Sequence, residues 1–311
     1  MKAVALPTGG PRPLKLNATG KMSGRKLGFV CLCTIPTTIL FVIFVVLPII
    51  NLIQTSFTEW NGIDGEKTFV GFDNYAILFR SSNFWEAFRN TVFLIVVVTA
   101  VTIGLSLYFA SVLARKGTKG KTFFRIVFYI PNILSIVVIS AIVSAILSPG
   151  TGLVSVMYGW AGKVYTGWLA NNRTVMWCIA AAMIWQAVGY YMVMYIAGMD
   201  SIPDSLYEAA DLEGASSARQ FFSITLPLTW EVIRTTLTFF IISTINMSFL
   251  FVDSMTQGQF GSHVLLTYMY QQAYTNSVYG YGMAIGVALF VFAYVLALIV
   301  QILTHREQVE Y

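Results

Sequence analysis

Six apolar runs, each long enough to cross a bilayer as a helix, constrain the fold of this 311-residue chain more than any other feature. Spanning the hydrocarbon layer takes roughly 20 helical residues. The pattern therefore predicts an all-α integral membrane protein with six transmembrane helices. The runs cover residues 28–53, 91–113, 126–147, 175–199, 232–252 and 281–303.

The composition agrees with a membrane protein and excludes most soluble classes. Hydrophobic residues make up 57% of the chain and charged residues only 11%, whereas soluble domains carry about 25% charged residues. So few charges cannot cover a surface that faces water. The net charge of +5 is modest and needs no nucleic acid to explain it. Cys31, Cys33 and Cys178 all lie in apolar runs, and we expect neither a disulfide framework nor a metal site.

Lys and Arg residues predict the orientation, because they gather on the cytoplasmic side of membrane proteins. Residues 1–26 are basic and rich in Pro and Gly, and we expect a disordered cytoplasmic tail there. A second basic cluster at 115–125 separates the second and third runs. Both clusters fall inside if the two termini are cytoplasmic, and the six-helix domain then covers 27–305 with a cytoplasmic end at 306–311. Of the 19 Lys and Arg residues, the opposite side receives only Lys67, Arg80, Arg89, Lys163 and Arg173.

The connection between the fourth and fifth runs, residues 200–227, is polar, falls on the cytoplasmic side and has helix signals. Ser201 or Asp204 could cap a first helix. Gly214 is placed to end that helix in a left-handed turn. A second short helix over 215–222 would follow, and Pro227 would open the fifth span, where its missing N–H costs little.

Seven residues of this connection follow a fixed spacing that resembles the "EAA" loop in permease subunits of bacterial ATP-binding cassette (ABC) importers. The spacing is E-A-A-x3-G-x9-I-x-L-P, formed by Glu208, Ala209, Ala210, Gly214, Ile224, Leu226 and Pro227. The resemblance implies a coupling helix between spans four and five that sits in a groove of an ATP-binding subunit. It assigns that contact to Glu208, Ala209, Ala210 and Gly214, and two small Ala side chains suit a close approach.

The same resemblance implies the partners and the location of the chain. These permeases work in pairs in the bacterial plasma membrane, with a second homologous permease, two ATP-binding subunits inside and a solute-binding protein outside. ATP and Mg are bound by the partner subunits, so we expect no cofactor in this chain and no enzyme activity. The triplet Gly120-Lys121-Thr122 looks like the end of a phosphate-binding loop, but Arg115 stands where that motif needs a glycine.

Flanking segments resemble the carbohydrate branch of these importers, and in particular the first, maltose-type, permease of the pair. One difference lies in an outside loop, where Gln259 and Phe260 occupy positions at which Gly and Pro are usual. The segments that carry the resemblance are residues 196–203, Phe72-Asp73-Asn74-Tyr75, Asn90-Thr91, Thr256-Gln257-Gly258, Thr267-Tyr268-Met269-Tyr270 and 280–284.

A sugar path needs hydrogen-bonding groups for hydroxyls and aromatic faces for the apolar side of the ring. Polar residues in spans four and five meet this need, since polar side chains in a membrane helix usually face the bundle interior. Ordinary helix–helix contact explains each of them about equally well. The candidates are Trp185, Gln186, Tyr190, Ser243, Asn246 and Ser248.

Two other functions compete with sugar import. Within the importers, the chain could carry glycerol-phosphate or another polar solute, although no cationic residue lies in the middle of a run. A stand-alone secondary transporter would usually place a carboxylate deep in the membrane. Glu231 and Asp253 instead lie near opposite ends of the fifth run, which favours the importer.

Overall fold

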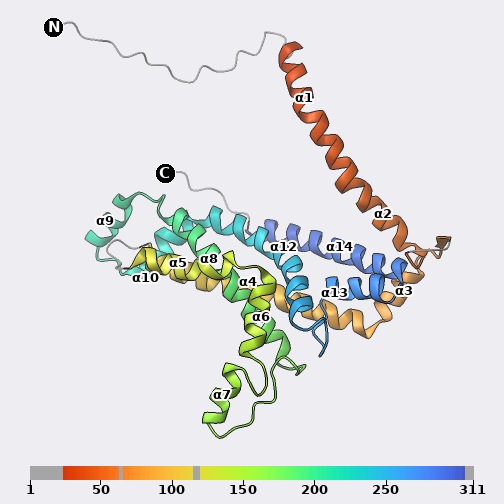
Figure 1. Cartoon of the computed structure of the whole chain (residues 1–311). Coiled ribbons are helices and arrows are strands. Elements are labelled where there is room, and N and C mark those ends of the chain that lie inside the picture. The colour runs from red at the N-terminus through yellow and green to blue at the C-terminus, as the bar shows by residue number, and fades with distance from the viewer. Residues whose placement is uncertain (1–23, 63–65, 115–119, 305–311) are drawn as a thin grey trace. The chain divides into compact units, whose positions relative to one another are not determined.

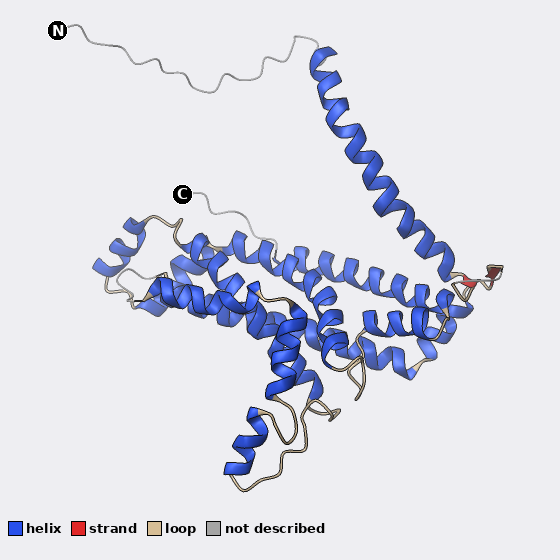
Figure 2. Cartoon of the chain, in the orientation of Figure 1, coloured by secondary structure: helices blue, strands red, loops and turns tan. Residues whose placement is uncertain are grey.

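The computed structural model describes residues 24–62, 66–114 and 120–304, so residues 1–23 of the predicted N-terminal tail and residues 115–119 of the basic cluster lie outside the described residues. The chain divides into two compact units, Met1–Asn51 and Leu52–Tyr311. Helices form most of the described chain, with a single pair of short strands (Figure 2). The prediction of a mostly helical protein is confirmed.

The first unit is helical wherever it is described. Helix α1 (Gly24–Phe41) leads through a π-helical turn (Val42–Val46) into α2 (Leu47–Ser56). The candidate span Gly28–Ser56 covers the predicted first run and has no buried side chains in its most apolar window. An apolar helix without a protein core around it is what a lipid-facing span looks like.

Four long helices of the second unit correspond to predicted spans two, four, five and six (Figure 1). The fourth prediction, 175–199, coincides with its helix, and the second helix begins nine residues before the predicted run. These helices are α4 (Ser82–Leu113), α8 (Val175–Met199), α12 (Trp230–Met255) and α14 (Tyr279–Thr304).

The predicted third span differs from a single helix. It is divided into α5 (Lys121–Ile133) and α6 (Ile136–Ile146), whose axes are bent by 99°. Leu134 is extended, with ψ 145°, and the Ser135 side chain caps α6 by accepting a hydrogen bond from the Val138 N–H. Pro131 also removes a backbone donor from the last turn of α5. The described residues therefore hold five helices long enough to span a bilayer and one bent pair that makes a sixth if it crosses as a unit.

Helix α8 is the centre of the bundle, and its position depends on small and polar contacts with its neighbours. Ile179, Met183 and Tyr195 of α8 have no exposed surface. Ser106 of α4 donates a hydrogen bond to the Val188 carbonyl (2.8 Å). The Tyr195 hydroxyl bonds the Thr236 hydroxyl of α12 at 2.9 Å.

Gly189 allows α5 to approach α8 backbone to backbone. A Cβ atom built at Gly189 would lie 1.8 Å from the carbonyl oxygen of Phe128 in α5. No side chain fits there, so α5 and α8 form a close pair. Small residues serve this purpose widely in membrane helix contacts.

Short elements cluster at the end of the second unit opposite to α9 and α10 (Figure 1). Asn74 ties two of them together, because its Nδ2 donates to the carbonyls of Ser56 (2.9 Å) and Thr58 (3.0 Å). The elements here are β1 (Thr58–Glu59), β2 (Thr68–Phe69), α3 (Asp73–Arg80), α13 (Leu265–Tyr270) and a π-helical turn (Gln271–Thr275); α7 (Leu153–Trp160) follows α6 in a separate loop.

The loop that contains Gln259 and Phe260 follows α12 and turns through left-handed backbone. Gln257 has φ 53° and Phe260 has φ 57°, which is uncommon for residues other than Gly. Asn90 of α4 holds this loop by donating to the carbonyls of Gly261 (2.8 Å) and His263 (2.9 Å). Burial lowers the pKa of His263, and nearby Glu86 partly opposes that shift.

We predict that Gly189→Ala destabilises the protein by about 1–3 kcal/mol, the usual cost of overfilling a tight contact. The new methyl group would have to displace the backbone of α5. The measurement is thermal unfolding of the purified protein in detergent. Gly104→Ala is the matched control, because nothing lies within 4 Å of a Cβ at that helical glycine. Equal melting temperatures for the two variants would contradict the close contact of α5 and α8.

Candidate functional site

The polar connection between α8 and α12 folds into a compact helical element that projects from the bundle (Figure 1). It consists of α9 (Asp204–Leu212), α10 (Ser217–Gln220), a π-helical turn (Phe221–Thr225) and α11 (Leu226–Leu228). The predicted first helix therefore exists. The expected caps were wrong: Pro203 occupies the cap position without a side-chain bond, and Asp204 is the first helical residue. The Ser201 hydroxyl donates backwards to the Gly198 carbonyl instead (2.7 Å).

The four residues expected to contact a partner lie in the second half of α9 and in the turn that ends it. Glu208 and Ala209 are exposed, and Ala210 is half-buried. Gly214 has φ 73°, which confirms the predicted left-handed turn. The Ala215 N–H then donates to the Ala210 carbonyl at 2.9 Å and closes the end of α9.

Leu212 is a feature of this surface that the sequence analysis missed. This large apolar side chain is 92% exposed at the last position of α9. The sequence signal for this exposure was that Leu212 stands between two acidic residues, Asp211 and Glu213, just before the turn at Gly214. Covering this side chain with a partner would remove apolar surface from water, which favours association.

Two hydrogen bonds brace α9 against the segment that follows it. The Tyr207 hydroxyl bonds the Thr225 hydroxyl at 2.9 Å. Gln220 Nε2 donates to Asp211 Oδ1 at 2.5 Å. The second helix is shorter than the predicted 215–222, because α10 passes into a π-helical turn at Phe221. Pro227 lies in α11, just before the fifth span rather than within its first turn.

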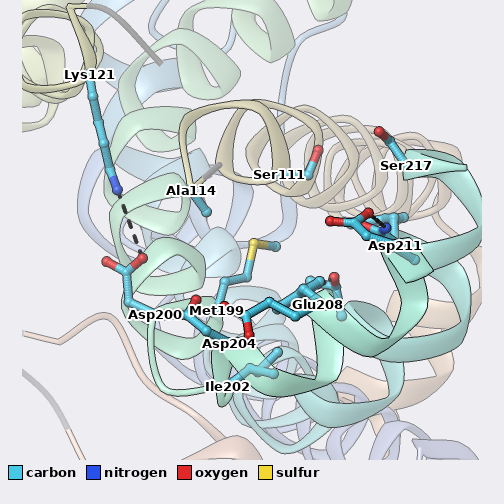
Figure 3. Close-up of a pocket in the computed structure, with 14 residues that line it drawn as sticks. Ser111, Ala114, Lys121, Met199, Asp200, Ile202, Asp204, Glu208, Asp211 and Ser217 are labelled. Carbon is cyan, nitrogen blue, oxygen red and sulfur yellow. Dashed lines mark hydrogen bonds and ion pairs between the residues drawn. The ribbon is translucent and has the colours of Figure 1, made fainter. Parts of the chain in front are cut away.

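A pocket of 690 Å³ lies between this element and the ends of α4 and α5 (Figure 3). Polar groups line most of it. Asp200, at the end of α8, forms ion pairs across one side, with Lys121 Nζ at 3.9 Å and Arg125 Nη2 at 3.5 Å. The other lining residues are Ser111, Ala114, Met199, Ile202, Asp204, Tyr207, Glu208, Asp211, Ser217, Gln220, Phe221 and Thr225.

The ion pairs at Asp200 were not predicted. The basic cluster and the acidic connection both fall on the cytoplasmic side of the predicted topology, which was the only sequence signal for them. Among the residues that the structure describes, no group of three His, Cys, Asp or Glu could hold a metal ion.

The six expected path residues do not lie together on one surface, and they differ in how far each is buried. In α8, Gln186 is buried, whereas Trp185 and Tyr190 are 44% and 39% exposed. Gln186 and Tyr190, although four residues apart, therefore differ in environment. Trp185 lines a separate apolar pocket of 500 Å³ together with Trp168 and Trp177.

The three candidates in α12 also differ. Ser248 is buried, Ser243 is half-buried and Asn246 is exposed. Both serine hydroxyls donate to carbonyls of their own helix, Ser243 to Phe240 (3.0 Å) and Ser248 to Ile245 (2.7 Å). They remain able to accept hydrogen bonds from a ligand.

Buried oxygens without a partner are the second feature that sequence analysis missed. Gln186 Oε1 has no hydrogen-bond partner among the described residues, and the same holds for the hydroxyls of Thr99, Thr102, Ser140 and Ser144 on α4 and α6. A buried polar group without a partner is costly and requires an explanation. Among the predicted path residues, Gln186 alone has a buried side-chain atom without a partner in the part of the chain that the structure describes.

Comparison with known proteins places this geometry in a family. Residues 100–308 match the model of the "Binding-protein-dependent transport system inner membrane component". The chain is 34% identical over 268 residues to the probable ABC transporter permease protein YurN of Bacillus subtilis, covering 84% of this chain and 90% of that one. It is 29% identical over 302 residues to the diacetylchitobiose uptake system permease protein NgcF of Streptomyces coelicolor, covering 91% and 85%.

A solved structure agrees with these relatives. A chain of a bacterial ABC transporter involved in the import of the acidic polysaccharide alginate superposes with a TM-score of 0.80 at 26% identity, covering 90% of this chain and 96% of that chain. Sequence and structure thus lead to one conclusion: this chain belongs to the family of inner membrane components, or permeases, of binding-protein-dependent ABC transport systems.

Proposed function

We propose that this permease forms, with a second homologous permease, the translocation path for a sugar or oligosaccharide, driven by ATP hydrolysed on separate subunits. In this proposal ATP and Mg bind to two ATP-binding subunits and not to this chain. Support for a carbohydrate comes from the relatives, which include uptake proteins named for diacetylchitobiose, starch degradation products and arabinooligosaccharides. A place as the first, maltose-type, permease follows from the flanking segments of the sequence.

The observation that carries the proposal is the α9 element. It presents Glu208 and Ala209 to solvent beside the exposed Leu212, and ends in a left-handed turn at Gly214. A small, rigid surface with one charged and one apolar anchor suits docking into a groove of a soluble subunit. We therefore assign α9 as the coupling helix, with Glu208, Ala209, Ala210 and Gly214 at the contact.

The proposed topology has six spans, with the bent pair α5–α6 as the third and both termini in the cytoplasm. Basic residues support this orientation, because Lys121 and Arg125 lie at the same end of the bundle as α9 and bond Asp200 there. The cluster of short elements at the opposite end would then face the outside. We propose that this outer end receives the solute-binding protein. A related alginate transporter has been solved with a pentasaccharide-bound periplasmic protein.

For the path itself, Gln186 has the strongest support, since its buried side-chain oxygen lacks a partner within the described residues. A sugar hydroxyl could supply the missing donor. Trp185, Tyr190, Ser243, Asn246 and Ser248 remain proposed contacts, the exposed ones through surfaces that a second permease would cover. Lys and Arg residues of the spans lie toward the helix ends, for example Arg89 and Arg234, which favours a neutral sugar over glycerol-phosphate.

Substitutions at Gly214 distinguish the effect of the left-handed backbone from the effect of an added side chain. A Cβ atom at Gly214 meets nothing within 4 Å, so a new side chain has room, and the cost comes from φ 73°. We predict that Gly214→Val abolishes sugar uptake, because a β-branched residue resists left-handed backbone, whereas Gly214→Asn retains most uptake. Uptake of labelled sugar into cells is the measurement, with membrane levels checked by blotting. Wild-type levels of uptake in both variants would show that the left-handed turn is unimportant.

Reversing the charge of Glu208 tests the docking surface. We predict that Glu208→Lys abolishes ATP-driven uptake and the binding of the ATP-binding subunits, while insertion into the membrane is unchanged. Co-purification of those subunits with the tagged permease is the direct readout. Glu59→Lys is the matched control for co-purification alone, since Glu59 is also exposed but lies in β1, at the end of the unit proposed to receive the solute-binding protein. Normal co-purification and uptake with Lys at position 208 would rule out this coupling contact.

A further inference from the structure

Three charged side chains connect the end of α8 to the start of α5, two segments far apart in the sequence. Asp200 Oδ2 lies 3.5 Å from Arg125 Nη2, and Asp200 Oδ1 lies 3.9 Å from Lys121 Nζ. Figure 3 shows Lys121 extending across the edge of the pocket to Asp200, directly before the chain enters α9. The same carboxylate thus contacts two successive turns of α5.

Stability of the fold does not by itself explain these ion pairs. The three side chains are 31–49% exposed, and partly exposed ion pairs contribute little to the free energy of unfolding. Their position is more informative than their strength. They join two helices at the point where the proposed coupling element leaves the membrane domain.

Hydrogen bonds join the parts of the segment that follows Asp200, from α9 to Thr225, into one body. Tyr207 is bonded to Thr225, and Gln220 to Asp211, so two side-chain hydrogen bonds resist a shift of α9 relative to the turn that follows it. This braced body joins the bundle covalently at Asp200 on one side and through α11 on the other. The ion pairs give it a third attachment, to α5.

Helix α5 leads from that attachment to the path. It contacts α8 at Gly189, and its Asn132 Nδ2 lies 3.5 Å from the Gln186 carbonyl. It then ends at the 99° bend into α6, which carries the unpartnered hydroxyls of Ser140 and Ser144. A displacement of the start of α5 would therefore reach both the bend and the surroundings of Gln186.

We propose that Asp200, Lys121 and Arg125 form an electrostatic tether that transmits the displacement of the coupling helix to α5 as well as to α8. Asp200 is a positioning residue in this mechanism, because it acts through α5 and does not touch the substrate. Without the tether, α9 would act on α8 and, through α11, on α12, and α5 would follow only through its packing against α8 at Gly189. This inference rests on the function proposed above.

The test uses the complete transporter reconstituted in proteoliposomes, with its ATP-binding subunits, second permease and binding protein, and measures sugar imported per ATP hydrolysed. We expect Asp200→Asn to lower that ratio about fivefold, the lower end of ordinary coupling between sites, while ATP hydrolysis continues. Asp200→Glu should restore most of the ratio. A role in folding alone would lower the amount of complex but not the ratio.

Two further variants make the result specific. Lys121→Gln combined with Arg125→Gln should reproduce the loss, and adding Asp200→Asn should lower the ratio no further, because the groups act as one unit. Glu231→Gln is the matched control: it removes the ion pair of Glu231 and Arg234 (3.6 Å), which lies within α12 and links no other helix.

The outcomes separate the tether from the function on which it depends. An unchanged ratio for Asp200→Asn in a fully assembled complex, or losses that simply add in the triple variant, would overturn the tether and leave the proposed function standing. A wild-type chain that recruits no ATP-binding subunit would overturn both.

Discussion

Inside a bilayer no water is available to the backbone, so every peptide group must find its partner within the protein. That constraint produces the long helices of this chain. Because the hydrophobic effect does not drive helices together within lipid, close packing between helices determines the specific structure. Gly189 is the clearest example, since a single missing side chain lets the α5 backbone lie against α8. The central position of α8 depends on this contact together with the bonds from Ser106 and to Thr236.

The element between α8 and α12 follows the opposite rule. Its surface is polar, its helices are short, and side-chain bonds at Tyr207 and Gln220 hold it together. A polar body braced by side-chain hydrogen bonds can pass a force from a soluble partner to membrane helices. The ion pairs at Asp200 extend this connection to α5, although Asp200 and Arg125 are 75 residues apart in the sequence.

Hydropathy and turn chemistry predicted much of this architecture. The bounds of the fourth span and the left-handed turn at Gly214 follow directly from apolar length and from the conformational freedom of glycine. The break at Ser135 was not predicted, because residues 126–147 are as apolar as a straight span and a capping serine gives only a weak signal. The ion pairs at Asp200 and the exposure of Leu212 depend on how distant segments fold together, which neither spacing nor composition contains. Gln186 and Tyr190 lie four residues apart in α8, yet only Gln186 is buried, because burial depends on which neighbouring helices cover each side chain.

The proposed function makes this permease one subunit of an ATP-driven sugar importer. Purification of the tagged chain from its native membrane in mild detergent, with its partners identified by mass spectrometry, tests that claim most directly. The account predicts recovery of an ATP-binding subunit and a second six-span permease, with a companion binding protein whose sugar specificity identifies the substrate. Recovery of the chain alone or as a self-oligomer, with no ATP-binding subunit even after cross-linking, would contradict the account and favour a stand-alone carrier.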